Sequence, residues 1–170
     1  GVCHSDLHLA DGVLGDGRWP IVLGHEGAGV VDAVGDGVEH LEVGDPVAFT
    51  FIPPCGRCGQ CRSGRWNMCV QAAEASYRGR MLDGTRRLHL DDGSELQHGL
   101  LVACFAEYSV VPAGAAIRIP SSLPLWQAAL VGCGVMTGFG AVRNVARVAV
   151  GDTCAVIGCG GVGLQVIAAC

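Results

Sequence analysis

Short apolar runs separated by glycine and turn residues fill the first part of the chain. They occur from Pro20 to Val34 and again from Val43 to Phe51, and both patterns are typical of short strands joined by tight turns. Phe105 to Val111 has the same character and stops before Pro112, so it predicts a further strand. We therefore expect this part of the chain to be rich in strands.

The stretch from Asn67 to Leu100 has a looser pattern and is interpreted as a surface lobe. Within it, Thr85 to Leu90 and Ser94 to Gln97 flank the turn-forming residues Asp91, Asp92 and Gly93. Two polar-apolar segments around such a centre predict a β-hairpin.

After Val111 the apolar positions predict helices and one buried strand. Pro124 to Val131 has an apolar stripe with proline in the first turn, which favours a helix start. Thr153 to Ile157 predicts a short buried strand, followed by a glycine turn at residues 158–163 and an apolar helix from Leu164. Strand, turn and helix in this order open a βαβ unit.

Composition and charge exclude several classes. The chain of 170 residues allows one domain, or one domain and part of another. Its net charge of −5, with no basic tract beyond Arg86 and Arg87, argues against nucleic acid as a partner. We find no stretch of about 18 uncharged apolar residues, so no membrane span is expected, and no export signal. Since the chain starts without methionine and stops in an apolar run, we expect a longer protein at both ends.

Four cysteines form the pattern Cys-x2-Cys-x2-Cys-x7-Cys, at Cys55, Cys58, Cys61 and Cys69. This spacing predicts a tetrahedral zinc site with no open position, which stabilises a loop and performs no chemistry. Nearby arginines offset the charge of four thiolates. Ten cysteines and six histidines favour metal and thiol chemistry in a reducing compartment, so the cytoplasm is the expected location.

Further candidate ligands are Cys3 with His4, His25 with Glu26, and Cys133. Two thiolates and one neutral imidazole cancel the charge of Zn²⁺ and leave one coordination position free, which suits a Lewis acid. Each of these side chains could instead be packed without a ligand. Cys104, Cys154, Cys159 and Cys170 are assigned to packing or to the ragged end of the chain.

Taken in order, the motifs resemble the zinc-dependent medium-chain alcohol dehydrogenases. They are residues 1–6 (GVCHSD), 24–26 (GHE), the four-cysteine loop, 132–135 (GCGV) and 158–163 (GCGGVG). Residues 79–85 and 88–90 further resemble the glutathione-dependent formaldehyde dehydrogenases and the nicotinoprotein alcohol dehydrogenases. The resemblance implies an α/β chain with a β-rich part: a GroES-like, partly closed β-barrel at 1–134, then the start of a Rossmann doubly wound parallel sheet at 135–170.

The resemblance also implies roles for single residues. A catalytic zinc would be held by Cys3, His25 and Cys133, and a structural zinc by the four cysteines of the loop. Asp6 would orient the His25 imidazole and Glu26 would lie behind the metal, since a ligating imidazole needs an acceptor for its other nitrogen. Ser5 would take the proton of the alcohol, and His8 would pass it to solvent.

For the cofactor, the resemblance implies that His4 meets the pyrophosphate and that Thr137 lies near the nicotinamide. The phosphates would lie on the glycine turn and the following helix start, at Gly158, Gly160, Gly161, Val162 and Gly163. The acidic residue that would distinguish NAD from NADP is expected about 20 residues further on, beyond residue 170, so this choice is not visible in the sequence. NAD is the cofactor expected, and NADP is not excluded.

The resulting function is a zinc-dependent oxidoreductase that interconverts a primary alcohol and an aldehyde by hydride transfer with a nicotinamide dinucleotide. The alternatives are a polyol or formaldehyde-adduct dehydrogenase, or a non-enzymatic zinc-stabilised binding module. A disulfide-linked secreted fold is disfavoured. We expect a small substrate, two zinc ions per chain, a homo-oligomer in the full-length protein, and no activity from these 170 residues alone.

Overall fold

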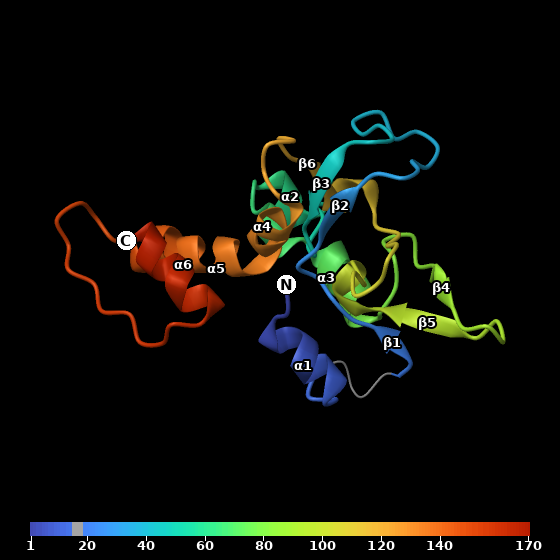
Figure 1. The fold of residues 1–170 in the computed structure, drawn as a ribbon, viewed down its shortest axis with the longest axis horizontal. Helices are drawn as coiled ribbons and strands as arrows, with labels where there is room; N and C mark the ends of the chain where they lie inside the picture. Colours follow the sequence, from blue (N-terminus) through green and yellow to red (C-terminus); the bar gives the residue numbers. More distant parts are fainter. Residues whose placement is uncertain (15–18) are drawn as a thin grey trace.

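Two small sheets form the frame of the computed structural model, which describes residues 1–14 and 19–170 (Figure 1). In the first, β3 (Pro46–Phe49) lies between β2 (Ala28–Val30) and β6 (Ala116–Arg118), and both pairs are antiparallel. In the second, β5 (Glu95–His98) pairs in parallel with β1 (Ile21–Val22) and antiparallel with β4 (Leu88–His89).

Most of the strand predictions are confirmed. β1 and β2 fall within Pro20 to Val34, β3 falls within Val43 to Phe51, and the hairpin forms with Leu88 opposite Leu96. The prediction for Phe105 to Val111 is wrong, because these residues, all of them described, form no strand. The place beside β3 is taken instead by β6, a few residues later, so both edges of β3 are already paired.

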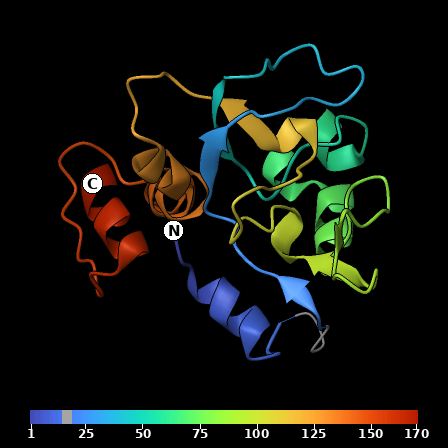
Figure 2. The ribbon, with the colours of Figure 1, turned by 45° about the vertical axis from the view of Figure 1, so that its right-hand side comes forward.

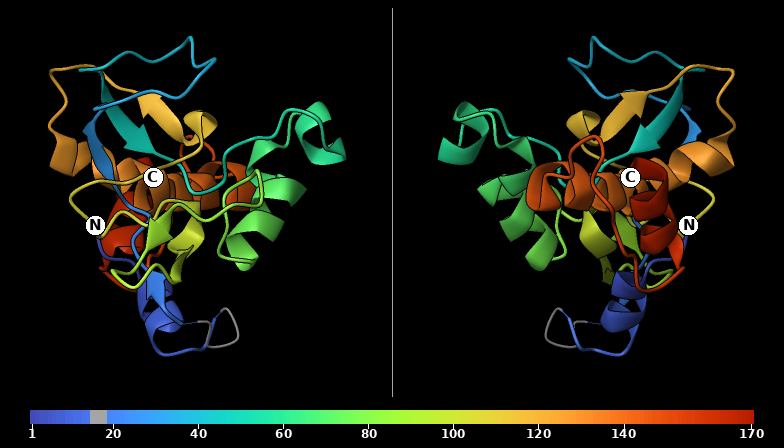
Figure 3. Two further views of the ribbon diagram at one scale, coloured as in Figure 1. Left: turned by 90° about the vertical axis from the view of Figure 1, so that its right-hand side faces the viewer. Right: turned by 90° about the vertical axis from the view of Figure 1, so that its left-hand side faces the viewer.

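The remaining short helices lie around these sheets. α1 (His4–Ala10) follows Cys3, and the Asp6 carboxylate accepts the Cys3 N–H at 3.1 Å, which caps the helix start. A lobe lies between β3 and β4 and so begins well before Asn67, the predicted start of the surface lobe. It carries α2 (Gly59–Arg62), the 3-10 turn η2 (Trp66–Met68) and α3 (Val70–Tyr77), and Figure 3 shows it projecting from the sheets. Two further 3-10 turns are η3 (Gly99–Leu101) and η4 (Ala113–Ala115).

A long helix follows β6 and starts where the sequence predicts. α4 (Leu125–Leu130) continues without a break through a π-helical turn η5 (Val131–Val135), α5 (Met136–Gly140) and a second π-helical turn η6 (Ala141–Ala146). α4 contacts β2 and β3, whereas α5 contacts α6 (Gly161–Ala169), as Figure 2 shows in a view nearly along the helix. Gly132 permits this approach, since a Cβ there would collide with the Phe49 carbonyl oxygen.

This helix, Leu125–Ala146, has 22 residues and is long and apolar enough to cross a membrane, by length and composition alone. The sequence predicts only the start of this helix, at Pro124 to Val131, and the helix continues through the glycines beyond it. The expectation that no segment spans a membrane stays a prediction. The core helix of a soluble protein passes the same test, so this is weak evidence for a span.

The predicted strand Thr153 to Ile157 does not form. Residues 147–160, all described, run as a loop that swings out from the rest of the chain, and the Ile157 side chain is fully exposed (Figure 1). A parallel strand needs a neighbour for its N–H and C=O groups, and the loop pairs with none in the described part of the chain. Only the glycine turn and α6 of the predicted Rossmann start are formed.

Buried apolar side chains gather in two small clusters. One lies on the first sheet around Leu41, Val47 and Ala116, and the other lies under the lobe around Cys61, Cys69 and Leu101. The assignment of four cysteines to packing holds for Cys104, which is half-buried. Cys154, Cys159 and Cys170 are exposed on the loop, on the glycine turn and after α6, so of the two assignments packing does not apply to them.

Candidate metal centres

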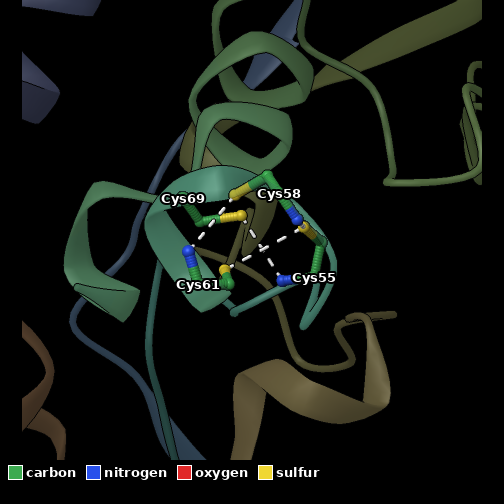
Figure 4. A group of neighbouring side chains, drawn as sticks. All are labelled: Cys55, Cys58, Cys61 and Cys69. Atoms are coloured by element: carbon green, nitrogen blue, oxygen red, sulfur yellow. Dashed lines mark hydrogen bonds between the residues drawn. The ribbon is translucent and has the colours of Figure 1, made fainter. Parts of the chain in front are cut away.

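The four lobe cysteines converge on one point. Their sulfur atoms all lie within 4.8 Å of one another, and Figure 4 shows the side chains pointing inward. Cys58 is the residue before α2, Cys61 lies inside α2, and Cys69 lies between η2 and α3. Backbone N–H groups of Cys58, Cys61 and Cys55 donate to the sulfurs of Cys55, Cys58 and Cys69, respectively.

These sulfurs differ in acidity. The N–H groups of Cys61 and Val70 lower the pKa of Cys58 to about 6, and N–H groups from Ala72 and Cys55 outweigh burial and lower the pKa of Cys69. Burial and neighbouring sulfurs raise the pKa of Cys61 to about 11. Without a cation, repulsion between neighbouring thiolates keeps one of the four cysteines protonated. Four thiolates at this distance therefore need a cation.

The geometry fits zinc. The Cys55 and Cys61 sulfurs are 3.9 Å apart. A tetrahedral zinc with Zn–S bonds of about 2.3 Å separates its sulfurs by about 3.8 Å. The four donors complete the tetrahedron, so the site is suited to a structural metal.

A second group of donors forms from three distant segments. Cys3 precedes α1, His25 lies in the loop between β1 and β2, and Cys133 lies in the π-helical turn η5. Their ligand atoms lie within 4.8 Å of one another, and the Cys3 and Cys133 sulfurs are 3.9 Å apart. Two sulfurs and one nitrogen match the donors of a catalytic zinc, with one position left for substrate or water.

Asp6 ties two of these segments together. Its Oδ1 lies 3.1 Å from His25 Nδ1 and accepts the Gly24 N–H at 3.0 Å, while its Oδ2 accepts the Cys3 N–H. Because Nδ1 faces Asp6, Nε2 is the nitrogen that His25 can offer to a metal.

The charges of this pair depend on one another. Burial opposes ionisation of both, but their mutual hydrogen bond outweighs it and lowers the pKa of Asp6. In the metal-free chain, the Asp6 hydrogen bond and the Cys133 sulfur raise the pKa of His25 to about 10. A metal at this site therefore displaces a proton from the imidazole.

Glu26 is also buried, at 7% exposure, and its Oε1 accepts the Gly134 N–H at 2.9 Å. The residue that follows His25 is thus bonded to the residue that follows Cys133. Phe51 packs edge-on against the His25 ring, with ring centroids 5.2 Å apart.

The other predicted residues lie farther out along these elements. The Ser5 hydroxyl is 3.8 Å from the Cys3 sulfur, and the rings of His4 and His8 meet edge-on at 4.6 Å. Thr137 is exposed on α5, one turn beyond Cys133.

The glycine turn has the geometry that its motif requires. Gly158 has a φ of +104°, which favours glycine, and a Cβ on Gly163 would collide with the Gly158 carbonyl oxygen. Gly160, Gly161 and Val162 lie at the exposed start of α6. None of these residues belongs to the three-donor group, but α6 packs against α5 and against η5, which carries Cys133.

Sequence reasoning missed three features of the site: the π-helical turn that carries Cys133, the Phe51 ring against His25, and the bond from Gly134 to Glu26. None has a local signal beyond glycines on both sides of Cys133. π-Helical turns are often found at functional sites.

Comparison with known proteins identifies the family of the chain. Residues 1–121 match the alcohol dehydrogenase GroES-like domain, and the chain belongs to this family. The resemblance to zinc-dependent medium-chain alcohol dehydrogenases, and to their class III subgroup, is thereby confirmed, as is the GroES-like fold of the first part.

Particular relatives include the probable S-(hydroxymethyl)glutathione dehydrogenase 1 of Schizosaccharomyces pombe, 46% identical over 96% of this chain and 43% of that protein. The class-3 alcohol dehydrogenase of Drosophila melanogaster is 44% identical over 100% of this chain and 45% of its own length. Among solved structures, an alcohol dehydrogenase zinc-binding domain protein from Burkholderia ambifaria has a TM-score of 0.90 and 38% identity, covering 99% of this chain and 45% of that one. The chain spans less than half the length of these relatives.

Proposed function

We propose that this chain is the catalytic part, with the first cofactor-binding segment, of a zinc-dependent dehydrogenase that interconverts a primary alcohol and an aldehyde. The observation that carries the proposal is the meeting of Cys3, His25 and Cys133, whose donor atoms lie within 4.8 Å of one another. A set of two thiolates and one imidazole keeps a coordination position for substrate, whereas the lobe's four sulfurs keep none.

Zinc in the three-donor site would polarise the hydroxyl of an alcohol and lower its pKa. Cys3 and Cys133 would balance the charge of the ion, and Asp6 would hold His25 in the ligating orientation. Ser5, whose hydroxyl lies beside the Cys3 sulfur, would take the proton, and His8 on the same helix would pass it to solvent, a role that suits imidazole near neutral pH.

A nicotinamide dinucleotide would accept or supply the hydride. The glycine turn and the start of α6 would hold its phosphates on backbone N–H groups, with His4 at the pyrophosphate and Thr137 near the nicotinamide. This division places the catalytic domain at 1–134 and the start of the dinucleotide domain at 135–170. NAD is the proposed cofactor, and NADP is the alternative.

A formaldehyde adduct is the second candidate substrate. It is supported by relatives in fission yeast and in Saccharomyces cerevisiae, both named S-(hydroxymethyl)glutathione dehydrogenase. We further propose two zinc ions per chain, a homo-oligomer and a cytoplasmic location for the full-length protein.

The test uses the full reading frame that contains this chain. We expect two zinc ions per chain, alcohol-dependent reduction of NAD, and loss of one zinc and of turnover in Cys133→Ala. The hydroxymethyl adduct of glutathione, assayed beside primary alcohols, separates the two substrates. Two retained zinc ions in Cys133→Ala, or no turnover with any of these substrates, would favour the zinc-stabilised binding module. Turnover by residues 1–170 alone would contradict the proposed need for the rest of the cofactor domain.

A further inference from the structure

The three donors of the proposed catalytic site belong to no common helix or strand. Cys3 precedes α1, His25 lies in a loop, and Cys133 lies in a helix whose sequence position is 130 residues from Cys3. Their spacing therefore depends on bonds between the segments. Asp6 provides such bonds between the Cys3 segment and the His25 loop, through the Cys3 and Gly24 N–H groups and the His25 ring.

Asp6 does not reach the Cys133 segment, but Glu26 does. Its Oε1 accepts the Gly134 N–H at 2.9 Å, and that nitrogen is bonded to the carbonyl carbon of Cys133. Glu26 is itself the neighbour of His25. The Glu26 carboxylate thus links the backbone beside His25 to the backbone beside Cys133.

The surroundings hold this carboxylate in place. Glu26 is 7% exposed, its backbone carbonyl accepts a bond from Gly1 N at 2.6 Å, and a Cβ on Gly1 would collide with its Oε2. On the other side, a Cβ on Gly134 would lie only 3.3 Å from Oε1. The side chain therefore fills the space between the residues before Cys3 and the π-helical turn.

We infer that Glu26 is a positioning residue, which sets the place of Cys133 by accepting the Gly134 N–H in the π-helical turn. This inference rests on the proposed function, because it assumes a metal on Cys3, His25 and Cys133. It concerns the acceptor oxygen and not the charge. The donor is a neutral amide, and two thiolates already balance a divalent ion.

Three substitutions separate these contributions. Glu26→Gln keeps an acceptor oxygen at the same reach and removes the charge, Glu26→Asp keeps the charge but is one methylene too short, and Glu26→Ala removes both. Glu39→Ala, at an exposed glutamate, is the matched control. The full-length protein is loaded with Co²⁺, and its release to a chelator is followed through the thiolate-to-cobalt absorption.

Release from the three-donor site should be about 10- to 100-fold faster in Glu26→Asp and Glu26→Ala, the usual effect of losing a bond that orients a ligand. Glu26→Gln and Glu39→Ala should stay close to the unsubstituted protein. Retention of the metal in the four-cysteine lobe shows that each variant is folded, and the Asp and Gln pair keeps the test decisive if Glu26→Ala does not fold.

Release as fast in Glu26→Gln as in Glu26→Asp would overturn the inference, because the charge would then be the contribution that matters. Unchanged release in Glu26→Asp would overturn it as well. An unsubstituted protein that binds metal only in the lobe would instead contradict the proposed function, so the two failures are distinguishable.

Discussion

The lobe and the three-donor site present similar sulfur spacings, 3.9 Å in each, but they are assembled in opposite ways. The four lobe cysteines lie in one stretch from Cys55 to Cys69, and two of them are nearly fully buried. The other site draws on three segments and needs the bonds of Asp6 and Glu26 to bring them together. A site built locally supports its own fold, whereas a site built from distant segments depends on a fold that already exists.

The largest effect is expected in the lobe. Cys69→Ser, at a fully buried sulfur, should remove the lobe metal and lower the free energy of unfolding by at least about 3 kcal/mol, since structural zinc contributes about 10–16 kcal/mol of apparent folding free energy in small domains. The measurements are zinc content and thermal unfolding. Cys159→Ser, at an exposed cysteine, is the control and should keep both. A Cys69→Ser variant with unchanged unfolding would show that the lobe folds without its metal.

A smaller effect is expected at the three-donor site. Cys3→Ser should lose one zinc ion and keep the other, while stability falls by about 1–2 kcal/mol, because the frame of this site is held by backbone bonds to Asp6 and Glu26. Zinc content and denaturant unfolding measure the two quantities. Equal destabilisation by Cys3→Ser and Cys69→Ser would erase the difference between the two sites.

The smallest effect concerns His98. This buried histidine lies in the hairpin and belongs to neither group of candidate metal ligands. Its Nε2 accepts the Arg87 N–H at 3.1 Å, and burial together with the charges of Arg87 and Arg86 lowers its pKa. The unfolded chain therefore binds the proton more readily. The stability that neutral His98 contributes is complete above pH 6.5, the ordinary histidine value, and is lost as the pH falls below it.

In a comparison of pH profiles, His98→Gln should flatten the loss of unfolding free energy below pH 6.5, by at most about 1.4 kcal/mol per pH unit. His40→Gln, at an exposed histidine, is the control variant. Parallel profiles for His98→Gln and the unsubstituted protein would show that His98 does not govern this loss.

The same contrast explains what could be predicted from the sequence. The spacing of Cys55, Cys58, Cys61 and Cys69 is a local pattern, and it predicts the cluster that the structure contains. The turn residues Asp91 to Gly93 likewise predict the hairpin of β4 and β5. These features depend on neighbours in the chain.

Features that depend on distant partners were predicted less well. Phe105 to Val111 and Thr153 to Ile157 have the composition of strands, but a strand exists only beside another, and neither has one in the described part of the chain. Cys3, His25 and Cys133 were brought together by the resemblance to a family, not by spacing. The bond between Glu26 and Gly134 has no sequence signal at all.

The long helix has different surroundings at each end. α4 packs on β2 and β3, and α5 packs on α6. Cys133 in η5 and Thr137 in α5 lie one turn apart. Under the proposed function, a displacement of this helix along its axis would move a metal ligand and a residue beside the nicotinamide site together. Seating of a dinucleotide would then change how the third ligand holds the metal.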